Sequence, residues 1–200
     1  MRKCPKIVLT GGPGGGKTVA GDLFRRELGD RVVVVPEAAT MIYQGGFPRG
    51  DGEALLKISQ HTIFNMQKSL EDTYRILYPD RYQICDRGTL DGLAYWPGPD
   101  EEFFRQMNTS FENEISQYDG VIFFETAAVG GLSIEGGNPI RIESIDEAKK
   151  IDFELRKVWS KHPNFIHIPH NQSFIEKITH GLSSIRVMLQ LLEHNNGHKS

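Results

Sequence analysis

A glycine-rich octapeptide near the start of the chain has the residue types that hold phosphate groups. It reads Gly11-Gly12-Pro13-Gly14-Gly15-Gly16-Lys17-Thr18 and satisfies the pattern G-x-x-x-x-G-K-[ST] at every fixed position. Glycines can turn backbone N–H groups toward phosphate oxygens, the lysine can bridge the β- and γ-phosphates, and the threonine hydroxyl can bind Mg²⁺. We therefore expect ATP as substrate and Mg²⁺ as cofactor. The expected nucleotide-binding residues are Gly12, Pro13, Gly14, Gly15, Gly16, Lys17, Thr18 and Val19.

The octapeptide has two other possible interpretations. A predicted strand ends at Thr10 and a predicted helix begins near Lys17, which is the context that phosphate binding requires. A turn that merely connects strand and helix is the alternative. A dinucleotide-binding loop needs glycines at i, i+2 and i+5, and this spacing fails from every glycine that could start it. The loop therefore excludes a Rossmann-type oxidoreductase.

A carboxylate and a guanidinium follow one another at the end of a second predicted strand, Tyr82 to Asp86. Ligands of open α/β sheets bind at the carboxyl ends of the strands, where proteins with such loops hold Mg²⁺ through an aspartate. We expect Thr18 and Asp86 to hold the metal, with helix capping as the alternative role of Asp86. Arg87 comes next, and the Asp-Arg pair indicates a guanidinium that clamps phosphate, as in small kinases.

A second carboxylate, Glu37, follows the apolar run Val32 to Pro36 and should reach the same edge of the sheet. There it could accept the proton of a substrate hydroxyl while the γ-phosphoryl group moves. The alternative is a carboxylate that caps the short helix starting at Ala38. Asp91, one turn beyond Asp86, is a weaker candidate, either for a substrate hydroxyl or as a structural hydrogen-bond acceptor.

Several arginines and aromatic residues are further candidates. Arg141 or Arg156 could supply the positive charge that stabilises phosphoryl transfer. Arg49 could reach an anionic substrate, although a solvated loop position is the simpler interpretation. Aromatic side chains near these strands could stack on a base or belong to the core; they are Tyr43, Tyr95 and Trp96.

Short β-branched runs alternate with helical patterns, which predicts an α/β fold with a parallel sheet covered by helices on both faces. Five strands are expected, at Lys6 to Thr10, Val32 to Pro36, Tyr82 to Asp86, Gly120 to Glu125 and Phe165 to Pro169.

Helices are predicted between these strands. Lys17 to Leu28 should pack Val19, Leu23 and Phe24 on one face, and Glu53 to Leu77 should bury its apolar residues, among them Leu55, Ile58 and Ile63. Capping boxes at Ser144-x-x-Glu147 and Ser173-x-x-Glu176 start two later helices, and Asp100 should cap a helix running to about Tyr118.

The chain is expected to form one domain over residues 1–192. A lid segment is expected at about 126–143, where glycine pairs bracket few apolar residues, and a disordered tail at 193–200. A passive surface loop is the alternative to the lid.

Composition narrows the classes of function. The chain has 200 residues, with 23 Lys plus Arg against 26 Asp plus Glu, and this balance disfavours a surface that coats nucleic acid. Two cysteines argue against a disulfide framework or a cysteine-rich zinc site. No apolar run is long enough for a signal peptide or a membrane helix, so a cytoplasmic protein is expected.

Four segments together resemble one family, the AAA-labelled P-loop domain shared by the kinase part of NadR and the TRPL-translocation-defect protein. The resemblance spans about residues 5–190 and implies a three-layer P-loop fold, similar to nucleoside and thymidylate kinases, with sheet order 2-3-1-4-5. It also implies nucleotide and magnesium roles for Lys17 and Thr18, an Asp-Arg pair like that of thymidylate kinases, and a base role for Glu37. The segments are Thr10 to Thr18, Pro36 to Ala39, Cys85 to Gly92 and Asn138 to Ser144.

The expected function is binding of Mg·ATP with hydrolysis or phosphoryl transfer to a small, nucleoside-like hydroxyl acceptor. A nucleotide-gated switch that binds ATP or GTP together with a protein or phosphoinositide partner is the alternative. A kinase of polynucleotide ends is disfavoured by the balanced charge. The expected catalytic residues are Lys17, Glu37, Asp86, Arg87 and Arg141.

Overall fold

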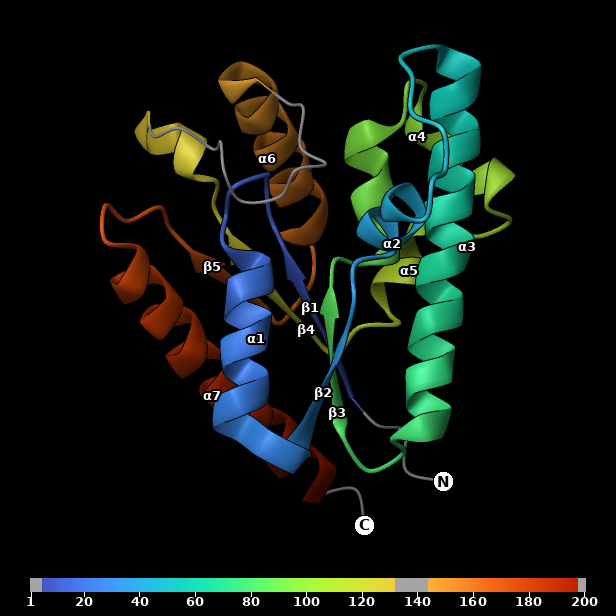
Figure 1. Cartoon of the computed structure of the whole chain (residues 1–200). Helices are drawn as coiled ribbons and strands as arrows, with labels where there is room; N and C mark the ends of the chain where they lie inside the picture. Colours follow the sequence, from blue (N-terminus) through green and yellow to red (C-terminus); the bar gives the residue numbers. More distant parts are fainter. Residues whose placement is uncertain (1–4, 132–143, 198–200) are drawn as a thin grey trace.

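One parallel sheet organises the chain. The computed structural model describes residues 5–131 and 144–197, and within them the strands lie in the order β2-β3-β1-β4-β5 (Figure 1). All four neighbouring pairs are parallel, which confirms the predicted α/β class and sheet order. The strands are β1 (Lys6–Thr10), β2 (Val32–Val35), β3 (Tyr82–Asp86), β4 (Gly120–Phe124) and β5 (Phe165–Ile168).

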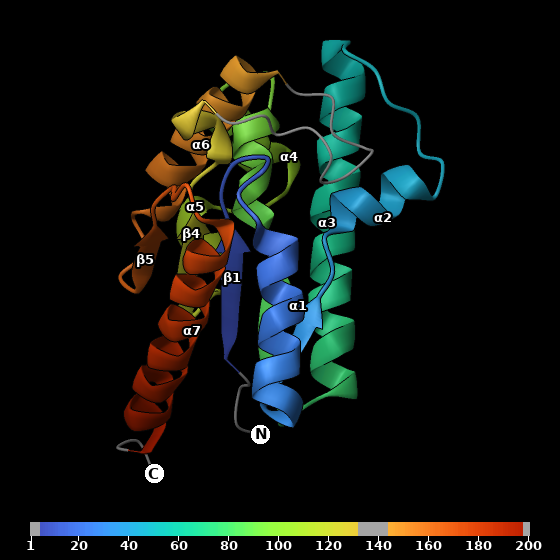
Figure 2. The same cartoon turned by 60° about the vertical axis from the view of Figure 1, so that its left-hand side comes forward.

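Helices cover both faces of this sheet (Figures 1 and 2). The α-helices are α1 (Lys17–Leu28), α2 (Ala38–Gln44), α3 (Glu53–Leu77), α4 (Asp100–Gln106), α5 (Phe111–Ile115), α6 (Ile145–Trp159) and α7 (Phe174–Gly197). Short 3-10 helices are η1 (Gly29–Arg31), η2 (Thr89–Tyr95) and η3 (Ala127–Gly130).

The side chains of β1 point alternately to the two faces of the sheet, and the core is divided into two layers. Ile7 and Leu9 pack with residues of α1 and α7 on one face. Val8, between them, packs on the other face with residues of α3, α4 and α6, including Trp159. Successive side chains of a strand point to opposite faces, so a strand that is covered on both sides is apolar throughout.

The helix α1 buries part of the face predicted for it, because Phe24 is in the core and Leu23 packs half-buried against it. Val19 is 52% exposed, whereas Ala20, Phe24 and Leu28 are buried. Gly21 is buried as well, and a Cβ there would meet Val34 and Leu9 at ordinary van der Waals distance. Strand boundaries differ less: β2, β4 and β5 each end one residue before the predicted position.

The long helix α3 also departs from the apolar stripe predicted for it. Ile58 is 57% exposed, and most of the buried positions are polar. These buried residues are Ser59, Gln60, Phe64, Gln67 and Glu71. Apolar periodicity predicted the helix correctly but only part of its buried face. Leu70 and Tyr74 pack half-buried against the core, whereas Gln60 and Phe64 line a cavity described below, and the Gln67 amide donates to Glu71 at 3.0 Å.

The helix predicted from Asp100 to Tyr118 is two helices. The chain leaves α4 through Asn108, which has a positive φ of 50°, and Ser110 then caps α5 by accepting from the N–H of Asn113. Of the two predicted capping boxes, that of Ser144 and Glu147 forms completely. At Ser173 only the bond from the Glu176 N–H forms, because the Ser173 N–H donates to Asn171 instead.

The proposed lid lies largely outside the described residues. Its described part begins with Thr126 and continues into η3, while residues 132–143, including Arg141, are not described. At the other end, α7 continues to Gly197, although the tail was expected to begin at residue 193. Among the helices that the structure describes, none has the length and apolar character needed to cross a membrane.

Candidate active site

The glycine-rich loop between β1 and α1 has the backbone shape expected for phosphate binding. Gly11, Gly14 and Gly16 have φ values of 129°, 75° and 89°, which side chains disfavour. A Cβ on Gly11 would lie 2.0 Å from the carbonyl oxygen of Phe124, and one on Gly15 would lie 2.6 Å from it. Glycine is therefore required both by the backbone conformation and by the close approach of β4.

The start of α1 has room for an anion. No described side chain caps the helix at Gly16, so the first-turn N–H groups are available to phosphate oxygens. The ammonium of Lys17 is buried and donates to the carbonyl oxygens of Gly11 at 2.8 Å and Gly12 at 2.9 Å. The lysine is thus held on the loop whose backbone would surround the phosphates.

Thr18 and Asp86 form a second part of the site. The Thr18 hydroxyl donates to Asp86 Oδ2 at 2.8 Å, and the buried Oδ1 of Asp86 has no described hydrogen-bond partner. Burial and the negative charge of Glu37 raise the pKa of Asp86, and Lys17 only partly opposes them. The Thr18 hydroxyl and the Asp86 carboxylate, one oxygen of which is buried and unpaired, suit Mg²⁺, which takes oxygen ligands and completes its shell with phosphate and water.

Arg87 lies between two carboxylates. Its Nε donates to Glu37 Oε1 at 2.6 Å and one terminal nitrogen donates to Asp91 Oδ2 at 2.9 Å. Burial lowers the pKa of Arg87, but Tyr95, Glu37 and Asp91 outweigh it and raise that pKa above its usual range. Burial likewise opposes ionisation of Glu37, yet Arg87 and the Thr40 hydroxyl, which donates at 2.6 Å, lower its pKa. Glu37 is therefore held ionised.

The two sequence hypotheses for Glu37 can be compared with this geometry. Glu37 occupies the position before α2, but its side chain makes no capping bond to that helix's backbone. Its oxygens instead accept from Arg87 and Thr40. Asp91 is buried and accepts from Thr10, Arg87 and Trp159, so its carboxylate serves as a hydrogen-bond acceptor within the protein.

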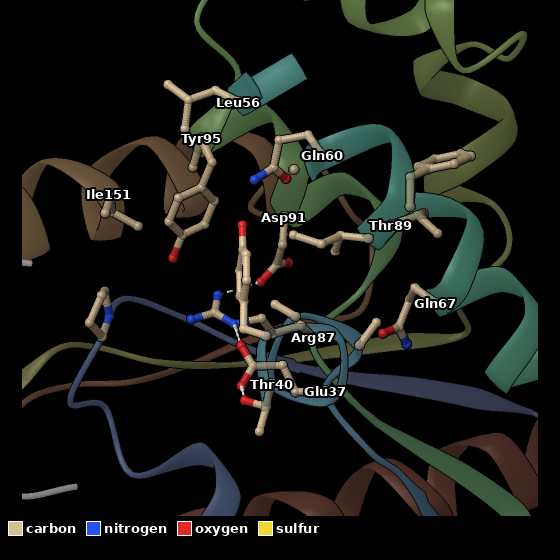
Figure 3. A pocket seen from close by; sticks show the side chains of 18 of the residues that line it. Glu37, Thr40, Leu56, Gln60, Gln67, Arg87, Thr89, Asp91, Tyr95 and Ile151 are labelled. Carbon is tan, nitrogen blue, oxygen red and sulfur yellow. Dashed lines mark hydrogen bonds and ion pairs between the residues drawn. The ribbon is translucent and has the colours of Figure 1, made fainter. Parts of the chain in front are cut away.

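A cavity of about 520 Å³ opens beside this cluster (Figure 3). Residues of α2, α3, η2 and α6 line it, and Pro13 brings the glycine-rich loop to one side. Tyr43 and Tyr95 both line the cavity, whereas Trp96 belongs to the core and packs edge-on against Phe103 with ring centroids 5.4 Å apart. The cavity thus joins the expected phosphate site to the Glu37–Arg87 pair.

A model of the AAA domain family matches residues 6–177. The chain belongs to this family. The fold is similar to that of thymidylate kinase from Ehrlichia chaffeensis, with a TM-score of 0.62 and 17% sequence identity over 94% of this chain and 99% of that one. The comparison with curated proteins gives no match. The predicted resemblance to an AAA-labelled P-loop domain with a kinase-like fold is therefore confirmed.

Sequence reasoning missed one residue that shapes the phosphate loop of this AAA-family domain. Asp152 of α6 is buried, and its Oδ1 accepts from the N–H groups of Gly12 and Thr126, both at 2.8 Å. The Thr126 hydroxyl in turn donates to the carbonyl oxygen of Pro13. The sequence does contain a signal for Asp152, because it is a carboxylate on the otherwise apolar buried face of a predicted helix.

The candidate arginines of this AAA-family domain lie in different places. Arg156 donates to Glu125 Oε1 at 3.3 Å and is absent from the lining of the large cavity. Arg49 lines that cavity, with its guanidinium 4.4 Å from the ring centroid of Tyr43. Arg141 lies outside the described residues.

Proposed function

We propose that this domain transfers the γ-phosphoryl group of Mg·ATP to a hydroxyl group of a small acceptor bound in the large cavity. The carrying observation is that Glu37 and Arg87 line the same cavity as Pro13 of the glycine-rich loop. Its volume of about 520 Å³ falls within the usual range for small-molecule sites.

The proposed roles divide between phosphate binding and acceptor binding. The loop N–H groups and Lys17 hold the β- and γ-phosphates, and Thr18 and Asp86 hold Mg²⁺, which would neutralise charge on the transferring group. Positioning and charge stabilisation supply most of the catalysis in phosphoryl transfer.

Glu37 is proposed to orient the acceptor hydroxyl and take its proton. Arg87 keeps Glu37 ionised and fixes the orientation of the Glu37 carboxylate, since Arg87 Nε and Glu37 Oε1 lie 2.6 Å apart. A carboxylate with a lowered pKa is a weak base, so the proton moves as the new O–P bond forms and the hydroxyl becomes acidic. We keep Arg141 as a proposed further source of positive charge during transfer.

The test measures ADP release from Mg·ATP by the purified protein, with and without a panel of nucleosides and nucleoside monophosphates. Stimulation by one acceptor, with a matching phosphorylated product, is the expected result. Lys17→Ala should lose nucleotide affinity, and Glu37→Gln should keep nucleotide binding but lose turnover. Hydrolysis that no acceptor stimulates, yet disappears in Lys17→Ala, would instead support the nucleotide-gated switch.

A further inference from the structure

Asp91, the second carboxylate that binds Arg87, is itself held by two fully buried donors. Its Oδ1 accepts from the indole N–H of Trp159 at 2.8 Å, and the Thr10 hydroxyl lies 2.9 Å from both carboxylate oxygens. Thr10, Asp91 and Trp159 are all buried, so water does not compete for these bonds. The plane of the carboxylate is therefore fixed, and its Oδ2 accepts from Arg87 at 2.9 Å.

Glu37 is held less firmly than Asp91. Its side chain is 19% exposed, against 5% for that of Asp91, and its oxygens accept only from Arg87 and Thr40 among the described residues. Figure 3 shows the guanidinium between the two carboxylates. The two bonds leave from different nitrogens of one planar group, so Glu37 can turn toward a bound hydroxyl while the bond to Asp91 stays in place.

Trp159 also packs on the backbone that follows Arg87. A Cβ on Gly88 would lie 2.8 Å from two atoms of the Trp159 ring, so the ring approaches this closely only because residue 88 has no side chain. Arg87 has a positive φ of 74°, which turns the chain at this point. The segment from Arg87 to Asp91 thus contacts Trp159 through its backbone and through its carboxylate.

The same face of α6 reaches the glycine-rich loop. Asp152 lies two turns before Trp159, and its Oδ1 accepts from the N–H of Gly12 at 2.8 Å. Residues seven positions apart share one face of a helix, and Leu155 between them is fully buried. This face of α6 therefore contacts the expected phosphate site through one side chain and the turn that carries Arg87 through another.

We propose that Thr10 and Trp159 are positioning residues, which hold the guanidinium of Arg87 through Asp91 while Glu37 engages the acceptor hydroxyl. Neither is among the described residues that line the cavity, so both act through Asp91. Without their hydrogen bonds the buried carboxylate would be met by Arg87 alone, and the guanidinium would move with it, away from Glu37. A small displacement of this kind slows transfer more than it weakens binding. The inference rests on the proposed function, because it concerns the same site.

Thr10→Val removes the hydroxyl with little change of shape. The kcat of acceptor-dependent ADP release should fall at least about tenfold. The Kd of a non-hydrolysable ATP analogue with Mg²⁺, measured by calorimetry, should stay within about twofold of the wild-type value. Thr10→Ser keeps the hydroxyl and should recover most of kcat.

Trp159→Phe removes the indole N–H and keeps an aromatic ring near Gly88, and it should lower kcat in the same way. Trp96→Phe is the matched control, because Trp96 is also in the core and its N–H has no described hydrogen-bond partner. The control should have the kcat of the wild type. If Trp159 had only a structural role, Trp159→Phe would unfold at lower urea while the folded protein kept its kcat.

An NMR measurement follows Arg87 without any acceptor. The Nε–H signal of Arg87, assigned by its absence in Arg87→Lys, should exchange slowly with water in the wild type, because Nε donates to Glu37 in a largely buried place. Thr10→Val should speed this exchange at least about tenfold, and Thr10→Ser should restore it.

Three results would overturn the inference: wild-type kcat in both Thr10→Val and Trp159→Phe, a fall in kcat matched by an equal loss of affinity for the ATP analogue, or unchanged exchange of the Arg87 signal in Thr10→Val. Faster exchange in a protein that phosphorylates none of the acceptors would support the inference about Arg87 and contradict the proposed transfer. Transfer at the wild-type rate in both variants would do the reverse.

Discussion

The guanidinium of Arg87 lies 2.6 Å from the carboxylate of Glu37, across 50 residues of sequence. The register of the sheet explains this approach, because Val35 of β2 pairs with Cys85 of β3 and both strands end at the same edge. Arg87 also has a positive φ of 74°, and its N–H donates to the carbonyl oxygen of Leu9. The backbone at the end of β3 is thus turned so that the guanidinium reaches Glu37.

Replacing Arg87 should change the pH dependence of catalysis. In Arg87→Leu, burial is opposed only by the Thr40 hydroxyl and the more weakly acting Lys17, so the pKa of Glu37 should rise. The proposed base role requires ionised Glu37, so the acid limb of the acceptor-dependent rate should move to higher pH. Arg87→Lys should shift this limb less, because it keeps the charge. An unchanged acid limb in both variants would contradict the role of Glu37 as base.

Asp152 should control nucleotide affinity through the loop backbone. In Asp152→Ala the buried N–H groups of Gly12 and Thr126 lose their acceptor, each at a cost of about 1–3 kcal/mol. Unfolding in urea should show the loss of stability, and ATP binding should weaken with it. Asp152→Asn keeps an oxygen at the same place and should recover much of both. Equal affinity in all three proteins would exclude this role.

The close approach of Gly11 and Gly15 to β4 can be tested by adding a Cβ to one of these glycines. Gly15→Ala should strongly impair nucleotide binding and stability, because the new Cβ would lie 2.6 Å from the Phe124 carbonyl oxygen, a backbone atom that cannot yield. Gly52→Ala is the matched control, since a Cβ there meets nothing within 4 Å, and its cost should stay near 1 kcal/mol. Thermal unfolding and ATP titration measure both effects.

Asp86→Asn should separate stability from function. The buried carboxylate has an unpaired oxygen and a raised pKa, so its charge is unfavourable in the metal-free protein. We expect the variant to unfold at higher urea than the wild type at neutral pH without Mg²⁺. Its ATP affinity should no longer increase when Mg²⁺ is added. A variant that is less stable and still responds to Mg²⁺ would contradict both parts.

Lys177 of α7 predicts a rise of stability in alkaline solution. Burial lowers the pKa of this lysine to about 8, below its usual value of 10.5. Between these values the unfolded chain binds more protons than the folded one, so the free energy of unfolding should increase with pH. Urea unfolding at pH 7.5 to 10.5 should show this increase relative to Lys177→Met, which cannot titrate. A constant difference between the two proteins would refute the prediction.

Local patterns were sufficient for much of the fold. β-branched runs predicted all five strands within one residue at their ends, and the octapeptide predicted the turn from β1 into α1. These signals work because strand and loop preferences act between near neighbours. They failed at Asn108, where one residue with positive φ divides the helix predicted from Asp100, and at Val19 of α1, which is exposed although it was expected to pack.

The sequence by itself determined the phosphate loop and placed Glu37, Asp86 and Arg87 at one edge of a parallel sheet, since strand ends meet there. Only the tertiary structure decided how these groups pair. It joined Arg87 to Glu37 and Asp91, brought Asp152 from α6 to the N–H of Gly12, and turned Gln60 into the cavity. Such contacts depend on how helices distant in sequence pack on the sheet, which no spacing within a single segment determines.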